Sequence, residues 1–411
     1  MALGSSPTDP SNRVLADPRA AALGQQLFFD PELSGPLGKA QPGQAVYLGT
    51  PGTPGRIACV DCHAPTGFFD DTRSTPGNVS FGIDFTNRNS PSVVNVGFYR
   101  VFGWDGRSDS LWMQCGVAFE SKAAMGGSRV RLARHIAAKY APAFEDLFGD
   151  AGFSRLDRDG GDETEFELAD GGKPSPASAQ YLNQIAADSY KAMAAYVSRL
   201  VSVNAPIDVY ASGDFTALSP AEKRGLKLFL GRAGCVECHA GPNFTDNQFH
   251  SVGVPQRGEH VPLIDQGRVD GLTQQVGGDQ AVFNRCGIFN DTQRSCVISL
   301  AGPTDAGLGQ FRTKSLRNVA RTPPYMHAGQ FQTLEEVVRF YNGGGGTTGF
   351  VGTKSSMTVP LGLTDAEVVD LVAFFQALSG EPVKPALTCD PSARNLEAGA
   401  HRYSPCPDGG R

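Results

Sequence analysis

The chain has 411 residues, with 36 basic against 42 acidic side chains and a formal net charge of −6. This length predicts two domains, and a hydrophobic content of 40% is enough to build real cores. The small acidic excess and the absence of a basic run argue against nucleic acid as a partner. No stretch reaches the apolar length that a membrane span needs.

The first predicted element is a helix in the segment DPRAAALGQQLFFDPELS, which closes at Pro31. A Gly- and Pro-rich loop follows, and then Cys59, Cys62 and His63 form the pattern C-x-x-C-H. Cysteines three apart lie on one helical turn, so both thiols can reach the two vinyl groups on one edge of a porphyrin. The histidine then lies under the iron as its proximal ligand. This pattern is the attachment signature of c-type haem.

Helical patterns return at residues 128–149 and 178–203, where apolar side chains recur at spacings of three and four. A new helix start follows, with Ser219 as N-cap, Pro220 at the first helical position and Glu222 close behind. This short amphipathic helix resembles the N-terminal one, which indicates a weak internal repeat of cytochrome-like domains.

A second C-x-x-C-H follows this helix and consists of Cys235, Cys238 and His239. A zinc site with four cysteine ligands is an open alternative, but it would not require a histidine after both pairs. A thioredoxin-like redox pair is another, but neither pattern follows a βαβ unit. Two covalently bound c-type haems are therefore the favoured interpretation, with His63 and His239 as proximal ligands. Two further helices are predicted at residues 333–342 and 364–379.

These patterns predict a mainly α fold, with two cytochrome c-like haem domains, many loops and little strand. We expect an N-terminal haem domain over residues 12–212, a C-terminal one over 213–385 and a tail over 386–411. Proximity favours the disulfides Cys286–Cys296 and Cys389–Cys406. Covalent haem attachment in bacteria normally takes place outside the cytoplasm, and no signal peptide is visible. We therefore expect a mature or recombinant form of a periplasmic protein.

The chain resembles the bacterial di-haem cytochrome c peroxidase family, in particular its MauG-like branch (MauG and MbnH type). The resemblance runs from LGQQLFFDPELS through both haem motifs to TPPYMHAGQFQTLEEVVRFYN. It implies hydrogen peroxide as a substrate, with the first haem as the reactive one. It also implies a calcium ion between the domains, held by Asn89, Thr322 and Pro324, since oxygen ligands suit Ca²⁺.

The resemblance assigns further roles near the first haem. Trp104 is expected to lie between the two irons and to relay electrons, with core packing as the alternative. Gln114 matches a glutamine of the distal pocket. Ala124 stands where the family has its acid–base carboxylate, so Glu120 is expected either to replace it or to be a solvated helix residue. The family's distal histidine is matched by Ile83, so the first haem should lack that sixth ligand.

At the second haem, Tyr341 stands where the peroxidases have a methionine ligand, as in the MauG-like branch. A phenolate is a hard anionic donor that stabilises oxidised iron, so the second haem could reach a high-valent state. A helix tyrosine with its ring in the core is the alternative, and Met326 and Met357 are rival ligands.

Three functions follow from the resemblance. The first is a MauG-like oxidase that uses peroxide to form a high-valent two-haem state and oxidises a residue, by preference tryptophan, of a partner protein. The second is a cytochrome c peroxidase that reduces peroxide with electrons from a small cytochrome or cupredoxin. The third is a non-enzymatic di-haem electron carrier, which the replacement at Ala124 would favour.

Overall fold

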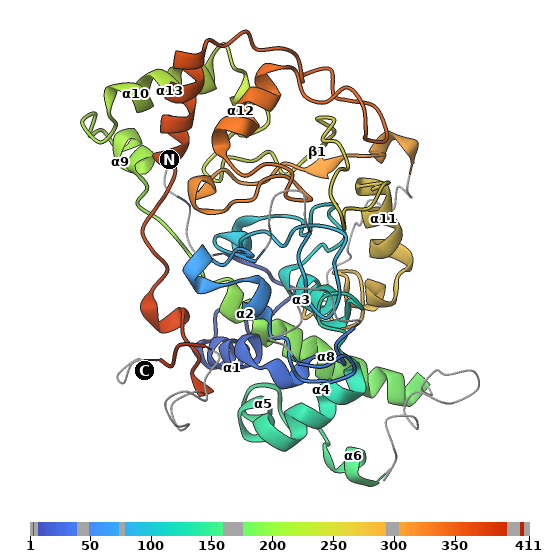
Figure 1. The fold of residues 1–411 in the computed structure, drawn as a ribbon. Coiled ribbons are helices and arrows are strands. Elements are labelled where there is room, and N and C mark those ends of the chain that lie inside the picture. Colours follow the sequence, from blue (N-terminus) through green and yellow to red (C-terminus); the bar gives the residue numbers. More distant parts are fainter. Residues whose placement is uncertain are drawn as a thin grey trace.

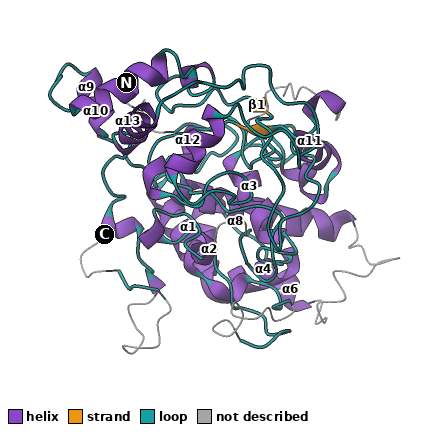
Figure 2. Cartoon of the chain, turned by 45° about the horizontal axis from the view of Figure 1, so that its top comes forward, coloured by secondary structure: helices purple, strands orange, loops and turns teal. Residues whose placement is uncertain are grey.

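The computed structural model describes residue 3 and residues 7–38, 49–73, 79–158, 176–292, 304–392 and 403–406. Helices and loops dominate the described chain, which confirms the predicted fold class (Figures 1 and 2). The helices are α1 (Pro18–Phe29), α2 (Cys59–Cys62), α3 (Leu111–Glu120), α4 (Arg129–His135), α5 (Ala141–Phe148), α6 (Ser154–Arg158), α8 (Pro176–Val197), α9 (Pro206–Ala211), α10 (Pro220–Leu230), α11 (Arg268–Gly277), α12 (Leu334–Asn342) and α13 (Asp365–Gln376).

Short 3₁₀ turns and one small sheet complete the described structure. The 3₁₀ turns span Pro31–Leu33, Pro65–Gly67, Val96–Phe98, Cys235–Glu237, Asp279–Phe283, Asp305–Gly307, Val319–Arg321 and Pro385–Leu387. Strands β1 (Phe249–His250) and β2 (Phe311–Arg312) pair antiparallel, with Phe249 opposite Arg312. None of the helices in the described ranges has the length and apolar content to cross a bilayer.

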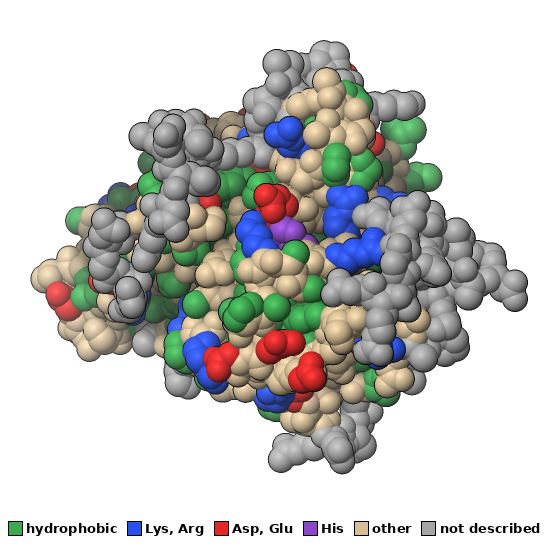
Figure 3. Space-filling view, turned by 90° about the horizontal axis from the view of Figure 1, so that it is seen from below, with side chains coloured by type: hydrophobic (Ala, Val, Ile, Leu, Met, Phe, Trp, Pro, Cys, Tyr) green, Lys and Arg blue, Asp and Glu red, His purple; other side chains and the backbone are tan. Residues whose placement is uncertain are grey.

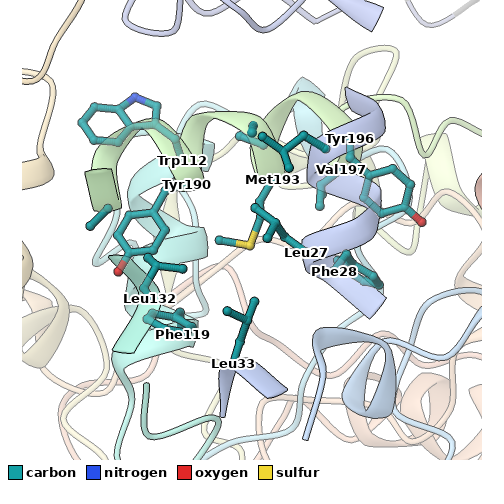
Figure 4. Packing of buried hydrophobic residues seen from close by; sticks show 14 of the residues in the cluster. Leu27, Phe28, Leu33, Trp112, Phe119, Leu132, Tyr190, Met193, Tyr196 and Val197 are labelled. Atoms are coloured by element: carbon teal, nitrogen blue, oxygen red, sulfur yellow. The ribbon is translucent and has the colours of Figure 1, made fainter. Parts of the chain in front are cut away.

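The structure has two lobes, one around the buried cluster that includes Leu27 and Tyr196 and one around the cluster that includes Phe229 and Phe374. The first lobe is built on the contact between α1 and α8. Asp17 caps α1 by accepting from the backbone N–H of Arg19 at 2.8 Å. Gly24 lets the helices meet closely, because a Cβ at this position would lie 2.0 Å from the carbonyl oxygen of Ala192. Large apolar side chains such as Leu27 and Tyr196 fill the core on this side (Figure 4).

The second lobe repeats this arrangement with α10 and α13. Ser219 and Glu222 form the expected N-terminal cap of α10, each accepting from the backbone N–H of the other. A Cβ at Gly225 would lie 2.0 Å from the carbonyl oxygen of Asp370 on α13. Each lobe therefore contains its own pair of helices, and the two helices of each pair meet at a glycine.

One predicted helix is divided in the structure. Residues 128–149 form α4, a π-helical turn over Ile136–Tyr140, and α5. Pro142 lies in the first turn of α5 and has no N–H to donate back to the preceding turn, so a continuous α-helix cannot pass through it.

Two buried clusters separate along the chain, since Leu200 belongs to the first and Ala205 to the second. The boundary near residue 212 stays a prediction. Three side chains from the second half, Phe283, Phe289 and Val383, are nevertheless buried in the first cluster. The space-filling view from below shows acidic and basic side chains interspersed on that face (Figure 3).

The chain after α13 runs back to the first lobe (Figure 1). The predicted disulfide Cys389–Cys406 is present in this tail, whereas Cys296 lies outside the described residues. The hydroxyl of Tyr403 donates to Asp61, a residue of α2, at 2.7 Å. The tail therefore contacts the first C-x-x-C-H directly.

Candidate functional site

The first C-x-x-C-H forms the one-turn helix α2. The carboxylate of Asp61 accepts from the N–H of Ala58 at 2.7 Å and holds the start of this turn. Burial raises the pKa of both Cys59 and Cys62 to about 12, so neither thiol is an activated thiolate. Reactive redox pairs have a lowered thiol pKa, and the environment of this pair therefore argues against a thioredoxin-like function.

The second C-x-x-C-H forms a 3₁₀ turn instead of an α-helical one. Burial raises the pKa of Cys235 to about 12, as in the first pair. The N–H of His239 donates to the carbonyl of Cys235 at 2.9 Å, and His63 makes the same bond to Cys59 at 3.0 Å. In both turns, therefore, the backbone of the histidine is held in the same position relative to the first cysteine.

The two histidines are oriented by matching hydrogen bonds. Nδ1 of His63 lies 3.2 Å from the carbonyl oxygen of Phe69, and Nδ1 of His239 lies 3.0 Å from that of Phe244. A carbonyl only accepts, so Nδ1 carries the proton and Nε2 is left with a free lone pair. Burial lowers the pKa of both imidazoles, which favours the neutral form that binds a metal.

A cavity of about 410 Å³ lies beside the second motif and extends between the lobes. Its lining includes Cys235, Cys238 and His239. Within the described part of the chain, the buried Nη1 of Arg312 and the buried Oε1 of Gln256 have no hydrogen-bond partner, and both residues line this cavity. Buried polar atoms are normally paired, so the cavity is suited to a large apolar group that also carries an anionic acceptor. A haem with its carboxylates fits this description.

Trp104 lies in the wall of this cavity, half-buried, at the boundary of the lobes. Its Nε1 donates to the carbonyl oxygen of Asn89 at 2.7 Å. Its ring meets that of His327 edge to face, with the centres 6.4 Å apart. Its ring therefore lies in the same cavity as the second motif and is not part of either buried cluster.

Tyr341 also lines the cavity and is carried by α12. The rival ligands Met326 and Met357 line it too, so the structure brings all three candidates to the second motif. Burial raises the pKa of Tyr341, so the free side chain is a neutral phenol. Only a bound cation such as iron would hold it as a phenolate in this environment.

The residues expected on the far side of the first haem meet as two adjacent segments. The N–H of Ile83 donates to the carbonyl of Ala124 at 2.9 Å, so the two non-ionisable residues that the resemblance matches to the family's histidine and carboxylate lie side by side. Gln114 accepts from the hydroxyl of Ser108 at 3.1 Å. Asp84, which sequence reasoning did not identify, follows Ile83 and donates its N–H to Ala123 at 3.0 Å.

Glu120 is fully engaged in the structure. Arg129 donates to both carboxylate oxygens, at 2.8 and 2.9 Å, and the hydroxyl of Tyr190 donates to one of them at 2.7 Å. These bonds tie α3 to α4 and α8. A side chain so occupied favours a structural role over the expected acid–base one.

The expected calcium ligands come together at the lobe boundary. Asn89 is buried, and its side-chain amide donates to the carbonyl of Pro324 at 3.3 Å. Asn89, Thr322 and Pro324 all line the cavity. Their amide and carbonyl oxygens are the kind of hard donor that Ca²⁺ prefers.

Three ionisable residues in the cavity wall, Asp70, Arg312 and Lys314, were missed by sequence reasoning. Asp70 is buried, and burial raises the pKa of its carboxyl well above the usual value. Burial likewise lowers the pKa of Lys314 well below the usual value, and that of Arg312 below its own. The only sequence signal is a pair of cationic residues two apart, at 312 and 314, in a chain segment with no other motif.

Comparison with known proteins gives a consistent result. Residues 18–216 match the sequence profile of the di-haem cytochrome c peroxidases. Cytochrome-c peroxidase IdrP1 of Denitromonas iodatirespirans is 33% identical over 380 residues, which cover 91% of this chain and 84% of that protein. The methylamine utilization protein MauG of Methylorubrum extorquens is 29% identical over 370 residues, covering 89% and 79%.

Solved structures have the same fold. A crystal structure of a MauG-like protein associated with microbial copper homeostasis aligns with a TM-score of 0.60 at 25% identity and covers 95% of this chain and 97% of that one. The di-haem peroxidase BthA of Burkholderia thailandensis aligns with a TM-score of 0.61 at 23% identity, covering 93% and 91%.

Proposed function

Because the chain belongs to the di-haem cytochrome c peroxidase family, and is thus a haem-dependent oxidoreductase, we propose that it uses hydrogen peroxide to oxidise a tryptophan side chain of a partner protein. The observation that carries the proposal is Tyr341 in the wall of the cavity that holds His239. The haem groups, when bound, would supply the chemistry that reduces peroxide. Everything else in the reaction falls to side chains of this chain.

His63 and His239 would hold the two irons, and their Nδ1 hydrogen bonds to backbone carbonyls fix the ring orientation. Gln114, on α3, would act as a hydrogen-bonding group above the first haem. Trp104 would carry electrons between the sites, since it lines the cavity and is held by Asn89. Ile83 and Ala124 carry no side chain that would bind the first iron, so peroxide would have access to it.

The tyrosine supports the oxidase over the peroxidase. A peroxidase needs its second haem as an electron donor to the first, and a neutral methionine ligand favours the reduced iron that this requires. An anionic phenolate favours oxidised iron instead. With Tyr341 as ligand, both haems would hold oxidising equivalents until a partner side chain gives up its electron.

The second candidate is a cytochrome c peroxidase fed by a small cytochrome or cupredoxin. It is favoured by the relatives named cytochrome-c peroxidase, at 33% identity, against 29% for MauG. Met326 and Met357 in the same cavity wall would supply the methionine ligand that this function needs.

The deciding experiment adds peroxide to the oxidised two-haem protein without any reductant. We expect a long-lived near-infrared absorption band shared by the two haems, which Tyr341→Met abolishes. Tyr210→Phe, on α9 and outside the cavity lining, is the matched control and should leave the band unchanged. Fast turnover with reduced cytochrome c, together with a methionine–haem charge-transfer band in the wild type, would favour the peroxidase.

We further propose that both haems are bound covalently and that a Ca²⁺ ion is held by Asn89, Thr322 and Pro324. Covalent haem survives acidic acetone extraction, and Cys59→Ser or Cys235→Ser should make one of the two haems extractable. The calcium should appear in metal analysis after mild purification. If it does not, and chelators leave the haem spectra unchanged, the calcium proposal fails.

The periplasm is the proposed location, because covalent haem attachment in bacteria takes place on that side of the membrane. The partner that donates electrons or is oxidised would then be a periplasmic protein. Osmotic-shock fractionation of the native host should release the protein with periplasmic markers, and recovery with cytoplasmic markers would contradict this.

A further inference from the structure

Tyr99 lies beside Trp104 at the boundary of the lobes. It follows the 3₁₀ turn Val96–Phe98, and its half-buried side chain lines the same cavity. The Nζ atom of Lys314 is 5.5 Å from the centre of the Tyr99 ring and 4.7 Å from that of Trp104. Because both distances are measured from the same nitrogen atom, the two ring centres lie no further apart than the sum of the two distances. An electron can pass between two aromatic rings at such a separation.

The two rings differ in what happens to their proton after oxidation. Nε1–H of Trp104 donates to the carbonyl oxygen of Asn89 at 2.7 Å. A peptide carbonyl does not retain a proton near neutral pH, so an oxidised Trp104 would stay a radical cation. An oxidised tyrosine instead loses its phenolic proton and becomes a neutral radical. The oxygen of Tyr99 accepts from the N–H of Ser315 at 3.0 Å, and this bond remains available in the radical.

The positive charge of Arg312 next to the rings also favours a radical on Tyr99 over one on Trp104. Arg312 is 3% exposed, and its Cζ lies 3.8 Å from the centre of the Tyr99 ring. Its Nε donates to the carbonyl of Gly103, next to Trp104, at 3.2 Å. Guanidinium is permanently charged, and a buried positive charge opposes a second one nearby. A radical cation at Trp104 is therefore disfavoured, whereas a neutral radical at Tyr99 is not.

From this geometry we propose that Tyr99 holds the oxidising equivalent after Trp104 and passes it to the partner's side chain. The proposal rests on the proposed function, which supplies peroxide as the oxidant. Tyr99 gives one electron to oxidised Trp104 and its phenolic proton to solvent. The partner's side chain then returns one electron, and solvent returns the proton. One peroxide takes up two electrons and two protons to give two waters, so two such transfers complete a turnover.

The test is freeze-quench EPR of the two-haem protein mixed with peroxide and no reductant. Samples are prepared with ring-deuterated tyrosine or with ring-deuterated tryptophan. We expect a radical signal that narrows with deuterated tyrosine only, and Tyr99→Phe should remove most of it. Tyr210→Phe is the matched control, because Tyr210 also has a lysine over its ring (Lys223, at 5.9 Å) but does not line the cavity.

A signal that narrows with deuterated tryptophan, or a tyrosine signal that persists in Tyr99→Phe, overturns the proposal. If peroxide leaves the haem spectrum of the same sample unchanged, the proposed function fails instead. Flash-quench oxidation with an external ruthenium photo-oxidant then still decides the question, because it oxidises the protein without peroxide. A radical at Tyr99 supports the proposal in that experiment, and a radical elsewhere contradicts it.

Discussion

The turns at Cys59–His63 and Cys235–His239 have the same inner framework and different surroundings. In both, the histidine N–H bonds back to the first cysteine, and Nδ1 bonds a carbonyl that follows five or six residues later. In both lobes a glycine lets one helix of the supporting pair touch the backbone of the other. These shared features hold a histidine in place and do nothing to distinguish the two sites.

The surroundings of the two turns are what differ. Near the first turn, the side chains of Ile83 and Ala124 neither bind a metal nor transfer a proton, and Asp84 is their ionisable neighbour. Beside the second turn, the cavity presents Tyr341, Arg312 and Lys314. The comparison teaches that the repeated part of the chain orients a histidine in each lobe, whereas the unrepeated part sets the side chains around it. Four sets of substitutions test this difference between the two sites.

The largest effect is expected from Ile83→His, which places an imidazole at the open side of the first site. The new side chain could bind the first iron and would then exclude peroxide, so the peroxide reaction should be almost completely lost. Stopped-flow absorbance measures this loss. EPR of the resting ferric protein should show a high-spin signal from the first haem in the wild type, and this signal should disappear in the variant. Ile83→Val is the control and should cost about 1 kcal/mol of stability with little change in rate. Unchanged peroxide reactivity in Ile83→His would show that this residue is not in the first distal wall.

Gly24→Ala and Gly225→Ala test the equivalence of the helix pairs. A Cβ at either position would lie 2.0 Å from a backbone carbonyl oxygen, so the helices must separate. We expect each variant to lose about 3 kcal/mol of unfolding free energy, measured by denaturant titration. Gly277→Ala in α11, with nothing within 4 Å of the added Cβ, is the control and should be neutral or slightly stabilising. A large loss in one lobe only would mean that the lobes are not built alike.

Glu120→Gln separates structure from catalysis at the first site. The change leaves Arg129 without its anionic partner, and about 2 kcal/mol of stability should be lost. The rate of the peroxide reaction should change only a few-fold, whereas loss of an acid–base group costs about a hundredfold or more. Asp84→Asn is measured alongside Glu120→Gln, because Asp84 is the carboxylate next to Ile83 in the chain. If Glu120→Gln alone abolishes the reaction, the acid–base role of Glu120 is established and the structural one is insufficient.

The smallest effect contrasts two aspartates on the supporting helices. Burial raises the pKa of Asp188, on α8, to about 6, whereas Asp370, on α13, is ion-paired with Arg224. Because the pKa is raised, the folded protein is more stable with Asp188 protonated than with Asp188 ionised. This contribution to the free energy of unfolding is fully present below pH 4 and is lost as the pH rises through about 6.

Asp188→Asn should accordingly gain about 1–2 kcal/mol at pH 8 and nothing at pH 4. Asp370→Asn should instead lose only a little stability at both pH values, because its partner Arg224 is largely exposed to solvent. Thermal unfolding at the two pH values measures both variants. Equal behaviour of the two would remove this difference between the lobes.

Local patterns in the sequence predicted much of the fold. The cap of α10 at Ser219 and Glu222 is formed within four residues, so it can be read from the chain alone. The cysteine spacing predicted the turns that carry His63 and His239 for the same reason. The break between α4 and α5 at Pro142 was available in the sequence but was outweighed by the regular apolar spacing around it.

Contacts between distant segments were harder to predict. The close approaches at Gly24 and Gly225 depend on which helix packs against them, and that partner lies far along the chain. The family resemblance singled out Trp104, Asn89 and Pro324, and the structure links them by hydrogen bonds, whereas their roles stay predictions. It gave no indication of Tyr99, because the position of this ring next to Lys314 arises only when the two lobes meet.

The bond between Tyr403 and Asp61 has a consequence for the order of events during biosynthesis. Asp61 holds the start of the first motif turn, and the same carboxylate oxygen accepts from a residue near the end of the chain. A ribosome makes Tyr403 long after Cys59 and Cys62, so this contact cannot form before the segment around Tyr403 has been made. Until that segment packs against α2, the first turn lacks its cover and is more accessible to maturation enzymes.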